Sequence, residues 1–172
     1  WMYPLKQFFG IGGAGVWWKG RTVIRDQNGR DGDSNNKFMP LSIAEQEIAY
    51  WDQTEDGLRV YTKVGGFGGS STRTELAAGI LAVGAYGGIH IGSDSRGFAD
   101  KANEYIKTIQ NKYKTKRSWK LISDGDLWHH FYNAIEAKGA HSVRITWVKG
   151  HATPEHIKCG VTTQENKEGN DE

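Results

Sequence analysis

The stretch from residue 58 to residue 93 constrains the fold most, because its hydrophobic pattern changes period twice. Residues 58–64 alternate apolar and polar side chains, which predicts a half-buried strand. Residues 74–86 carry apolar side chains at helical spacing, and two glycines follow them. Residues 89–93 form a short apolar run, which predicts a second strand. A strand, a helix and a strand in succession indicate an α/β fold.

The other segments extend this pattern to a mixed five-stranded sheet flanked by helices. A Gly-rich segment, residues 10–15, has the spelling of a dinucleotide-binding motif. Strand-forming residues follow it where that motif needs a helix, so we interpret it as a flexible loop that enters a strand. The remaining predicted elements are strands at 16–24 and 143–148, helices at 95–111 and 125–138, and a short helix at 43–51.

The length of 172 residues corresponds to one domain, spanning 1–172, at about 150 residues per domain. Residues 25–57 contain eight acidic and three basic residues, and we interpret them as an acidic insertion between strands. The net charge of +2 commits the chain to no charged partner. The single cysteine, Cys159, excludes a disulfide framework. With no signal peptide or membrane span apparent, we expect an intracellular protein, in nucleus or cytoplasm.

Both ends of the sequence look cut. The chain starts at Trp1 and stops at Glu172, inside a polar stretch that is compatible with a helix. We therefore expect a fragment, covalently joined to other domains in a longer polypeptide.

Three carboxylates carry the strongest chemical signal, although each also has a structural interpretation. Glu75 could form a capping box with Thr72, Asp94 could be a helix N-cap, and Asp171 could be solvated. At a strand end and on an adjoining helix, however, such carboxylates can converge. Their repulsion is relieved by divalent cations such as Mg²⁺ or Mn²⁺, which in pairs promote phosphoryl transfer. By contrast, His151, His156 and Cys159 lack the fourth ligand of a usual zinc site.

The segment from residue 101 to residue 120 supplies a matching basic surface. It contains seven basic residues against one acidic residue, with Tyr105, Tyr113 and Trp119 between them. A solvated helix face would explain this pattern. Lysines interleaved with aromatics also suit contact with a phosphate backbone and stacking on bases or sugars.

Together these motifs resemble type 1 ribonuclease H, the family that cleaves RNA in RNA–DNA hybrids. The resemblance covers most of the chain outside the acidic insertion, and the last tryptophan-containing block is its most specific part. Its blocks are 10–16 (GIGGAGV), 70–76 (SSTRTEL), 91–95 (IGSDS), 126–128 (DLW) and 147–152 (WVKGHA).

The resemblance implies roles for individual residues. Glu75, Asp94 and Asp171 match the second, third and fourth of four carboxylates that bind two Mg²⁺ ions, with Mn²⁺ as a substitute. His151 matches a mobile histidine that assists proton transfer and product release. The residues implied to contact the hybrid are Ser71, Thr72, Arg96, Tyr105, Lys112, Lys114, Lys116, Arg117 and Trp119.

The chain departs from the family pattern in one important respect. The family's first carboxylate lies in an Asp-Gly-Ser motif upstream of the Gly-rich segment, and no acidic residue occurs at positions 1–9. We therefore expect this fragment to lack part of its active site. Two hypotheses remain: a hybrid-cleaving endonuclease, such as the nuclease segment of a retroelement polyprotein, and a non-catalytic nucleic-acid-binding domain of the same fold.

Overall fold

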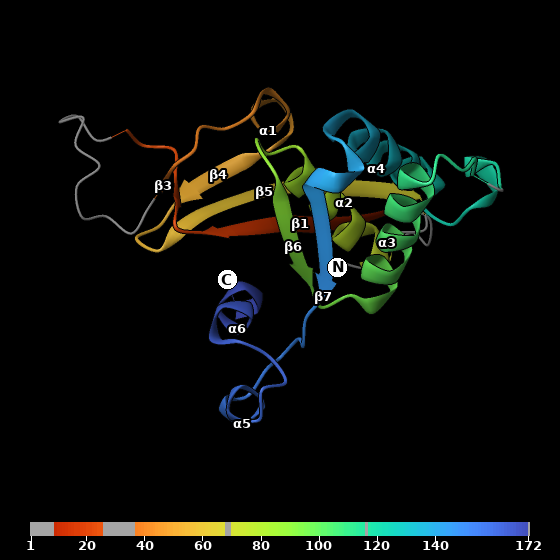
Figure 1. Ribbon diagram of the computed structural model, residues 1–172. Coiled ribbons are helices and arrows are strands. Elements are labelled where there is room, and N and C mark those ends of the chain that lie inside the picture. Colours follow the sequence, from red (N-terminus) through yellow and green to blue (C-terminus); the bar gives the residue numbers. More distant parts are fainter. Residues whose placement is uncertain (1–8, 26–36, 68–69, 116, 172) are drawn as a thin grey trace.

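The computed structural model describes residues 9–25, 37–67, 70–115 and 117–171, and it shows an α/β arrangement (Figure 1). This confirms the predicted fold class, since a mixed set of strands is flanked by helices. The main strands are β1 (Phe9–Lys19), β4 (Tyr50–Gln53), β5 (Gly57–Phe67), β6 (Ile89–Ser93) and β7 (Val143–Trp147). The main helices are α2 (Ser71–Val83), α3 (Arg96–Gln110), α4 (Gly125–Lys138) and α6 (Gln164–Asp171).

The long antiparallel pair of β1 and β5 is the largest element of the sheet. Every residue of β1 has a partner on β5, from Phe9 opposite Phe67 to Lys19 opposite Gly57. The Gly-rich residues 10–15 lie inside β1, so the prediction of a loop there is wrong. The continuous ladder with β5 overrides the low strand propensity of glycine. β4 adds a third antiparallel strand on the far side of β5.

The strands β6 and β7 form a separate parallel pair, with Ile89 opposite Val143 and Ser93 opposite Trp147. The five principal strands are therefore divided between a three-stranded and a two-stranded ladder. In the described parts of the chain, no hydrogen-bonded ladder joins β1 to β6. A small parallel pair, β2 (Arg21–Thr22) with β3 (Lys37–Phe38), lies beside them.

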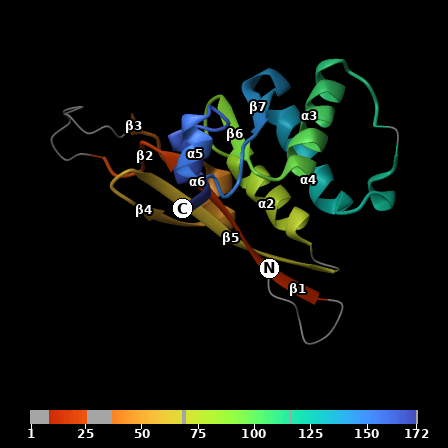
Figure 2. The same cartoon turned by 90° about the horizontal axis from the view of Figure 1, so that it is seen from below.

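The helices α2, α3 and α4 pack together and enclose the main core (Figures 1 and 2). Phe98, Trp128 and Phe131 are buried where the three helices meet. Gly79 allows α2 to approach α3 closely, because a Cβ at this position would lie 2.4 Å from the ring of Phe98. Two 3-10 turns, Trp119–Leu121 and Ala140–Ser142, flank α4.

The acidic insertion contributes a short helix and strand β4. Helix α1 (Ile43–Ile48) confirms the predicted helix and ends three residues earlier than expected. A buried ion pair between Arg21 and Glu45, with an N–O distance of 2.7 Å, holds it against the sheet. This ion pair adds to the pairing of β3 with β2 and of β4 with β5, which also join the insertion to the domain.

The C-terminal helices α5 (Pro154–Lys158) and α6 lie apart from the group of α2, α3 and α4 (Figures 1 and 2). The sequence predicted a loop where α5 lies, although Pro154 at its first turn is a typical start signal. An ion pair between Glu168 and Lys19 joins α6 to β1. Among the described residues, no helix is both long and apolar enough to span a membrane.

Candidate active site

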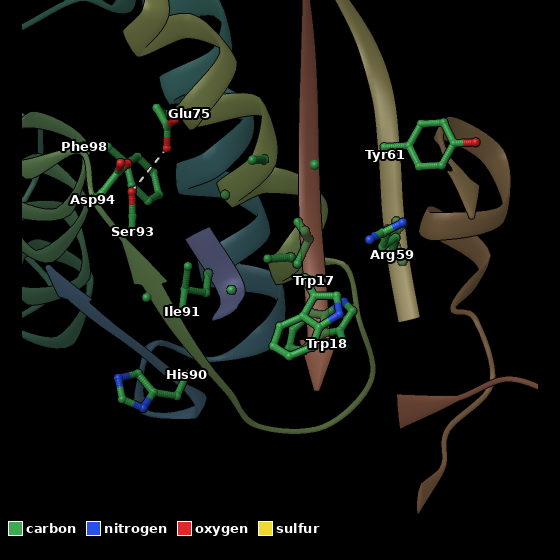
Figure 3. Close-up of a pocket in the computed structure, with 18 residues that line it drawn as sticks. Trp17, Trp18, Arg59, Tyr61, Glu75, His90, Ile91, Ser93, Asp94 and Phe98 are labelled. Carbon is green, nitrogen blue, oxygen red and sulfur yellow. Dashed lines mark hydrogen bonds between the residues drawn. The ribbon is translucent and has the colours of Figure 1, made fainter. Parts of the chain in front are cut away.

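The carboxyl end of β6 and the start of α2 bring Glu75 and Asp94 to one cavity (Figure 3). Ser93 ends β6 and Asp94 follows it directly, while Glu75 lies near the start of α2. The cavity measures about 520 Å³, and β1 and β5 form its other side. The structure therefore confirms that these two of the predicted carboxylates converge.

Neither carboxylate has the structural role that the sequence left open. The N-cap of α2 is Ser70, whose side chain accepts a hydrogen bond from the backbone N–H of Arg73. The N-cap of α3 is Ser95, whose side chain accepts from the backbone N–H of Phe98. Because serines cap both helices, Glu75 and Asp94 are available for another task.

Ser93, directly beside Asp94 in the sequence, holds the Glu75 carboxylate. Its Oγ donates a hydrogen bond to Glu75 Oε2 at 3.2 Å (Figure 3). The same Oγ accepts a hydrogen bond from the backbone N–H of Ser95, also at 3.2 Å. Burial raises the pKa of Glu75, the negative charge of Asp94 raises it further, and the bond from Ser93 lowers it only in part. A carboxylate whose pKa is raised by burial and by a neighbouring carboxylate suits a hard cation, which would relieve the repulsion between the two charges.

The WVKGHA block shapes the surroundings of Asp94. The indole N–H of Trp147 donates to the backbone carbonyl of Asp94 at 3.0 Å. A Cβ at Gly150 would lie 2.5 Å from Asp94 Oδ2, so only glycine leaves room for the carboxylate there. His151 follows in a left-handed conformation, with φ of 48°, and is exposed. The block thus places a histidine directly after the residue that contacts Asp94.

The backbone of Asp171 lies in the last turn of α6, but its side chain is outside the described part of the structure. Gly169, two residues earlier, lines the same cavity as Glu75 and Asp94. The described side chains contain no group of three His, Cys, Asp or Glu residues that could hold a metal ion. Glu75 and Asp94 are therefore the two described ligand candidates, and their oxygen chemistry fits Mg²⁺ or Mn²⁺.

The basic segment divides into an exposed part and a packed part. Lys112, Lys114 and Arg117 are exposed, whereas Lys116 lies outside the described residues. Tyr105 is only 8% exposed, and its ring contacts Trp119, whose own ring stacks on His129. Tyr105 and Trp119 therefore belong largely to a protein aromatic cluster, which corrects the expectation of two open stacking surfaces.

A second cavity of about 910 Å³ opens beneath this segment. Cationic and aromatic side chains share its lining. The residues that carry this character are Lys101, Tyr105, Tyr113, Lys114 and Arg117.

The other predicted contact residues lie on the first turns of α2 and α3. Ser71 and Thr72 are exposed on the first turn of α2. Arg96 is exposed at the start of α3, with its guanidinium carbon 4.5 Å from the centre of the Trp147 ring.

Sequence reasoning missed Arg73 as an organising residue. Its guanidinium donates to Asp126 at 2.7 Å and 3.0 Å, to Asp124 at 3.2 Å and to the carbonyl of Gly65. It thereby ties the start of α2 to the start of α4. The arginine in the SSTRTEL block and the aspartate in the DLW block were the available signal for this ion pair, but no sequence rule pairs residues this far apart.

An open groove separates the two ladders. β1 pairs with β5 and β6 pairs with β7, and within the described ranges no strand pairs with their other edges. Residues of both strands line the 520 Å³ cavity, as do the side chains of Trp17 and Trp18. Both indole nitrogens are buried without a hydrogen-bond acceptor among the described residues. The groove therefore offers backbone and side-chain donors that an additional extended segment could satisfy.

Comparison with known proteins identifies the family. No curated protein and no solved structure matches the chain significantly. The RNase H family profile matches residues 44–168, which is well over half of the 172 residues and includes Glu75, Asp94 and His151. β1 precedes the matched region and Asp171 follows it. The chain belongs to the ribonuclease H family.

Proposed function

We propose that this protein is a metal-dependent endonuclease that hydrolyses the RNA strand of RNA–DNA hybrids by a two-metal-ion mechanism. Membership of the ribonuclease H family supports hybrid nuclease chemistry. The observation that carries the proposal is the pair of Glu75 and Asp94, which line one cavity. Neither residue caps a helix, and burial together with the charge of Asp94 raises the pKa of Glu75. Such a destabilising arrangement of like charges is typical of functional sites.

In this mechanism Glu75, Asp94 and Asp171 hold the ions, and Ser93 keeps Glu75 turned toward Asp94. Bound Mg²⁺, or Mn²⁺ in its place, would supply Lewis acidity toward the scissile phosphate and lower the pKa of the attacking water. Gly150 keeps the space beside Asp94 free of a side chain.

His151 is proposed to assist proton transfer and product release. His151 is exposed and directly follows Gly150, the residue that lies beside the Asp94 carboxylate. An imidazole changes charge near neutral pH, so it can take up or release a proton during turnover.

The hybrid is proposed to extend from this site across the basic segment. Ser71, Thr72 and Arg96 are exposed within four residues of Glu75 or Asp94 in the sequence, and Lys112, Lys114 and Arg117 present exposed positive charge. Cations of this kind bind phosphates through counterion release, so hybrid affinity should fall steeply with salt.

We also infer that the groove between β1 and β6 receives a further strand, which carries the remaining carboxylate to the site. Among the described residues, no strand pairs with the second edge of β1 or of β6, and the indole N–H groups of Trp17 and Trp18 have no acceptor, which supports this inference. A strand there would join the two ladders into one mixed sheet and would run past Glu75 and Asp94.

The decisive experiment is a cleavage assay on a labelled RNA–DNA hybrid with Mg²⁺, beside duplex DNA and duplex RNA, with a chain that is extended to include an Asp-Gly-Ser strand. We expect RNA cleavage in the hybrid alone, abolished by Asp94→Asn and unaffected by Asp100→Asn, which neutralises an exposed carboxylate on α3. Cleavage unaffected by Asp94→Asn would refute the proposal.

The second candidate is a non-catalytic hybrid-binding domain. The basic segment supports it, because Lys112, Lys114 and Arg117 are exposed and would bind a phosphate backbone without a metal. It predicts hybrid binding with a steep salt dependence and no cleavage. A longer chain that includes an Asp-Gly-Ser strand distinguishes the two, since only the nuclease would then cleave. If the longer chain also fails to cleave, the binding function stands.

A further inference from the structure

Trp147 lies where the second ladder ends at the active site. It is the last residue of β7 and pairs in register with Ser93, the last residue of β6. Its side chain is 37% exposed, an unusual position for a large ring that could have been buried in the adjacent core. This position calls for an explanation beyond packing.

The indole ring makes two contacts, one with the backbone of Asp94 and one with the side chain of Arg96. Its N–H donates to the backbone carbonyl of Asp94 at 3.0 Å. Its face lies under the guanidinium of Arg96, with the carbon 4.5 Å from the ring centre. Between the two contacts lies Ser95, the N-cap of α3.

We propose that Trp147 is a positioning residue that fixes the backbone of Asp94 and the guanidinium of Arg96 through a single ring, so that metal binding and hybrid binding are organised together. The inference rests on the proposed function, because it assigns Asp94 to the metal and Arg96 to the hybrid. It adds a residue for which the family resemblance supplied no role.

The chemistry of Arg96 identifies its ligand class. Within the described chain Arg96 forms no ion pair, and its guanidinium carbon lies over the indole ring, so its N–H groups remain available as donors. A planar guanidinium binds phosphate oxygens through paired hydrogen bonds. Stacking on the ring reduces the conformational freedom lost on binding. The ligand of Arg96 is therefore a backbone phosphate of the hybrid.

The two contacts can be separated by substitution. Trp147→Phe keeps an aromatic face for Arg96 and removes the N–H donor to Asp94. Trp147→Leu removes both contacts, and Arg96→Gln removes the cation alone. Trp51→Leu is the matched control, because Trp51 is 43% exposed on strand β4 and lies away from the site.

Hybrid binding without divalent metal tests the arm to Arg96. We expect Arg96→Gln to weaken binding about fivefold and to reduce the slope of log Kd against log salt by about one. Trp147→Leu should weaken binding about threefold. The double variant should bind no more weakly than Arg96→Gln, because Trp147 acts through Arg96. Losses that multiply would overturn the proposal.

Cleavage kinetics test the arm to Asp94. With Mg²⁺, Trp147→Phe should lower kcat about tenfold, with Kd for the hybrid unchanged within twofold. An unchanged kcat in Trp147→Phe also overturns the proposal. Thermal unfolding of every variant beside Trp51→Leu separates these effects from loss of fold.

The outcomes distinguish this inference from the proposed function. Coupled binding losses in a protein that never cleaves would support the link between Trp147 and Arg96 and refute the nuclease. Cleavage accompanied by independent binding losses would support the nuclease and refute the link between Trp147 and Arg96. Absence of hybrid binding by the unchanged protein refutes both.

Discussion

Two glutamates near the starts of helices show how differently this domain treats buried acids. Glu45 on α1 is 1% exposed and receives hydrogen bonds from the Arg21 guanidinium at 2.7 Å and 2.9 Å. Burial raises its pKa, but the bonds from Arg21 and from the backbone N–H of Ser42 outweigh that effect, so the pKa is lowered. Glu75 on α2 faces Asp94 instead of a cation, and its pKa is raised.

This contrast separates scaffold from site. Glu45, Asp124 and Asp126 hold elements together by pairing with an arginine, and Glu168 does so by pairing with Lys19. Glu75 and Asp94 form no ion pair with any residue in the described ranges. The domain therefore accepts like-charge repulsion at one place, and a bound cation is the natural compensation.

The largest effect is expected when the ion pair between Glu45 and Arg21 is broken. Glu45→Gln should lower the free energy of unfolding by about 3 to 5 kcal/mol, because it leaves Arg21 buried without a counterion. Denaturant unfolding measures this change. Glu47→Gln, which neutralises an exposed acid on the same helix, is the control and should change stability by less than about 0.5 kcal/mol. Equal losses in both variants would contradict the assignment of Glu45.

The second prediction concerns a substitution that displaces the Asp94 carboxylate, which has no cationic partner among the described residues. Gly150→Ala places a Cβ 2.5 Å from Asp94 Oδ2, which is too close, so the carboxylate must move. We expect Mg²⁺-dependent cleavage to fall about 100-fold, as for an ångström-scale misplacement of a reacting group. The stabilisation of the protein by Mg²⁺ in thermal unfolding should be lost in parallel. Gly97→Ala, on the first turn of α3 and open to solvent, is the control.

A third test removes the cation that joins α2 to α4. Arg73→Met should lower the free energy of unfolding by about 2 kcal/mol, because Asp124 is left largely buried without its partner. The loss is smaller than for Glu45→Gln, since the side chain of Asp126 is 61% exposed and remains solvated. Asp126→Asn should cost less than about 1 kcal/mol. An Asp126→Asn loss equal to that of Arg73→Met would assign the whole effect to the exposed pair.

The smallest effect has the opposite sign. Asp94→Asn should raise the free energy of unfolding by about 1 kcal/mol without metal at neutral pH, because it removes the charge that opposes ionised Glu75. Because the pKa of Glu75 is raised, the folded state holds its proton more tightly than the unfolded chain. Stability therefore falls as pH rises from 4.5, the ordinary pKa of a glutamate side chain, to the raised pKa of Glu75 in the folded state.

The pH profile of stability supplies the measurement. The decrease in the free energy of unfolding with rising pH should be shallower in Asp94→Asn than in the unchanged protein. Mg²⁺ should stabilise the unchanged protein more than this variant. A variant that is less stable than the parent at neutral pH would contradict the repulsion.

Much of the fold was predictable because it depends on local periodicity. The elements β5, β6, β7, α1, α2, α3 and α4 were all predicted near their observed bounds. The strand character of the Gly-rich segment was missed, because it depends on pairing with β5 some 50 residues away. α5 was missed because its five residues give too little pattern to detect.

The candidate site was predictable in its residues and not in its support. Glu75 and Asp94 were identified by motif and by their places at element ends. The capping by Ser70 and Ser95, the bond from Ser93 and the contact with Gly150 depend on three-dimensional placement. The burial of Tyr105 was missed because its aromatic partner Tyr132 lies on another helix.

The open edges of β1 and β6 also have a consequence for the behaviour of the protein in solution. Unpaired strand edges are templates for intermolecular β-pairing, and neither β1 nor β6 has a proline to block it. Chains at high concentration should therefore associate edge to edge. A segment that fills the groove would act as an internal safeguard against aggregation, so the same strand that completes the chemistry would also keep the domain monodisperse.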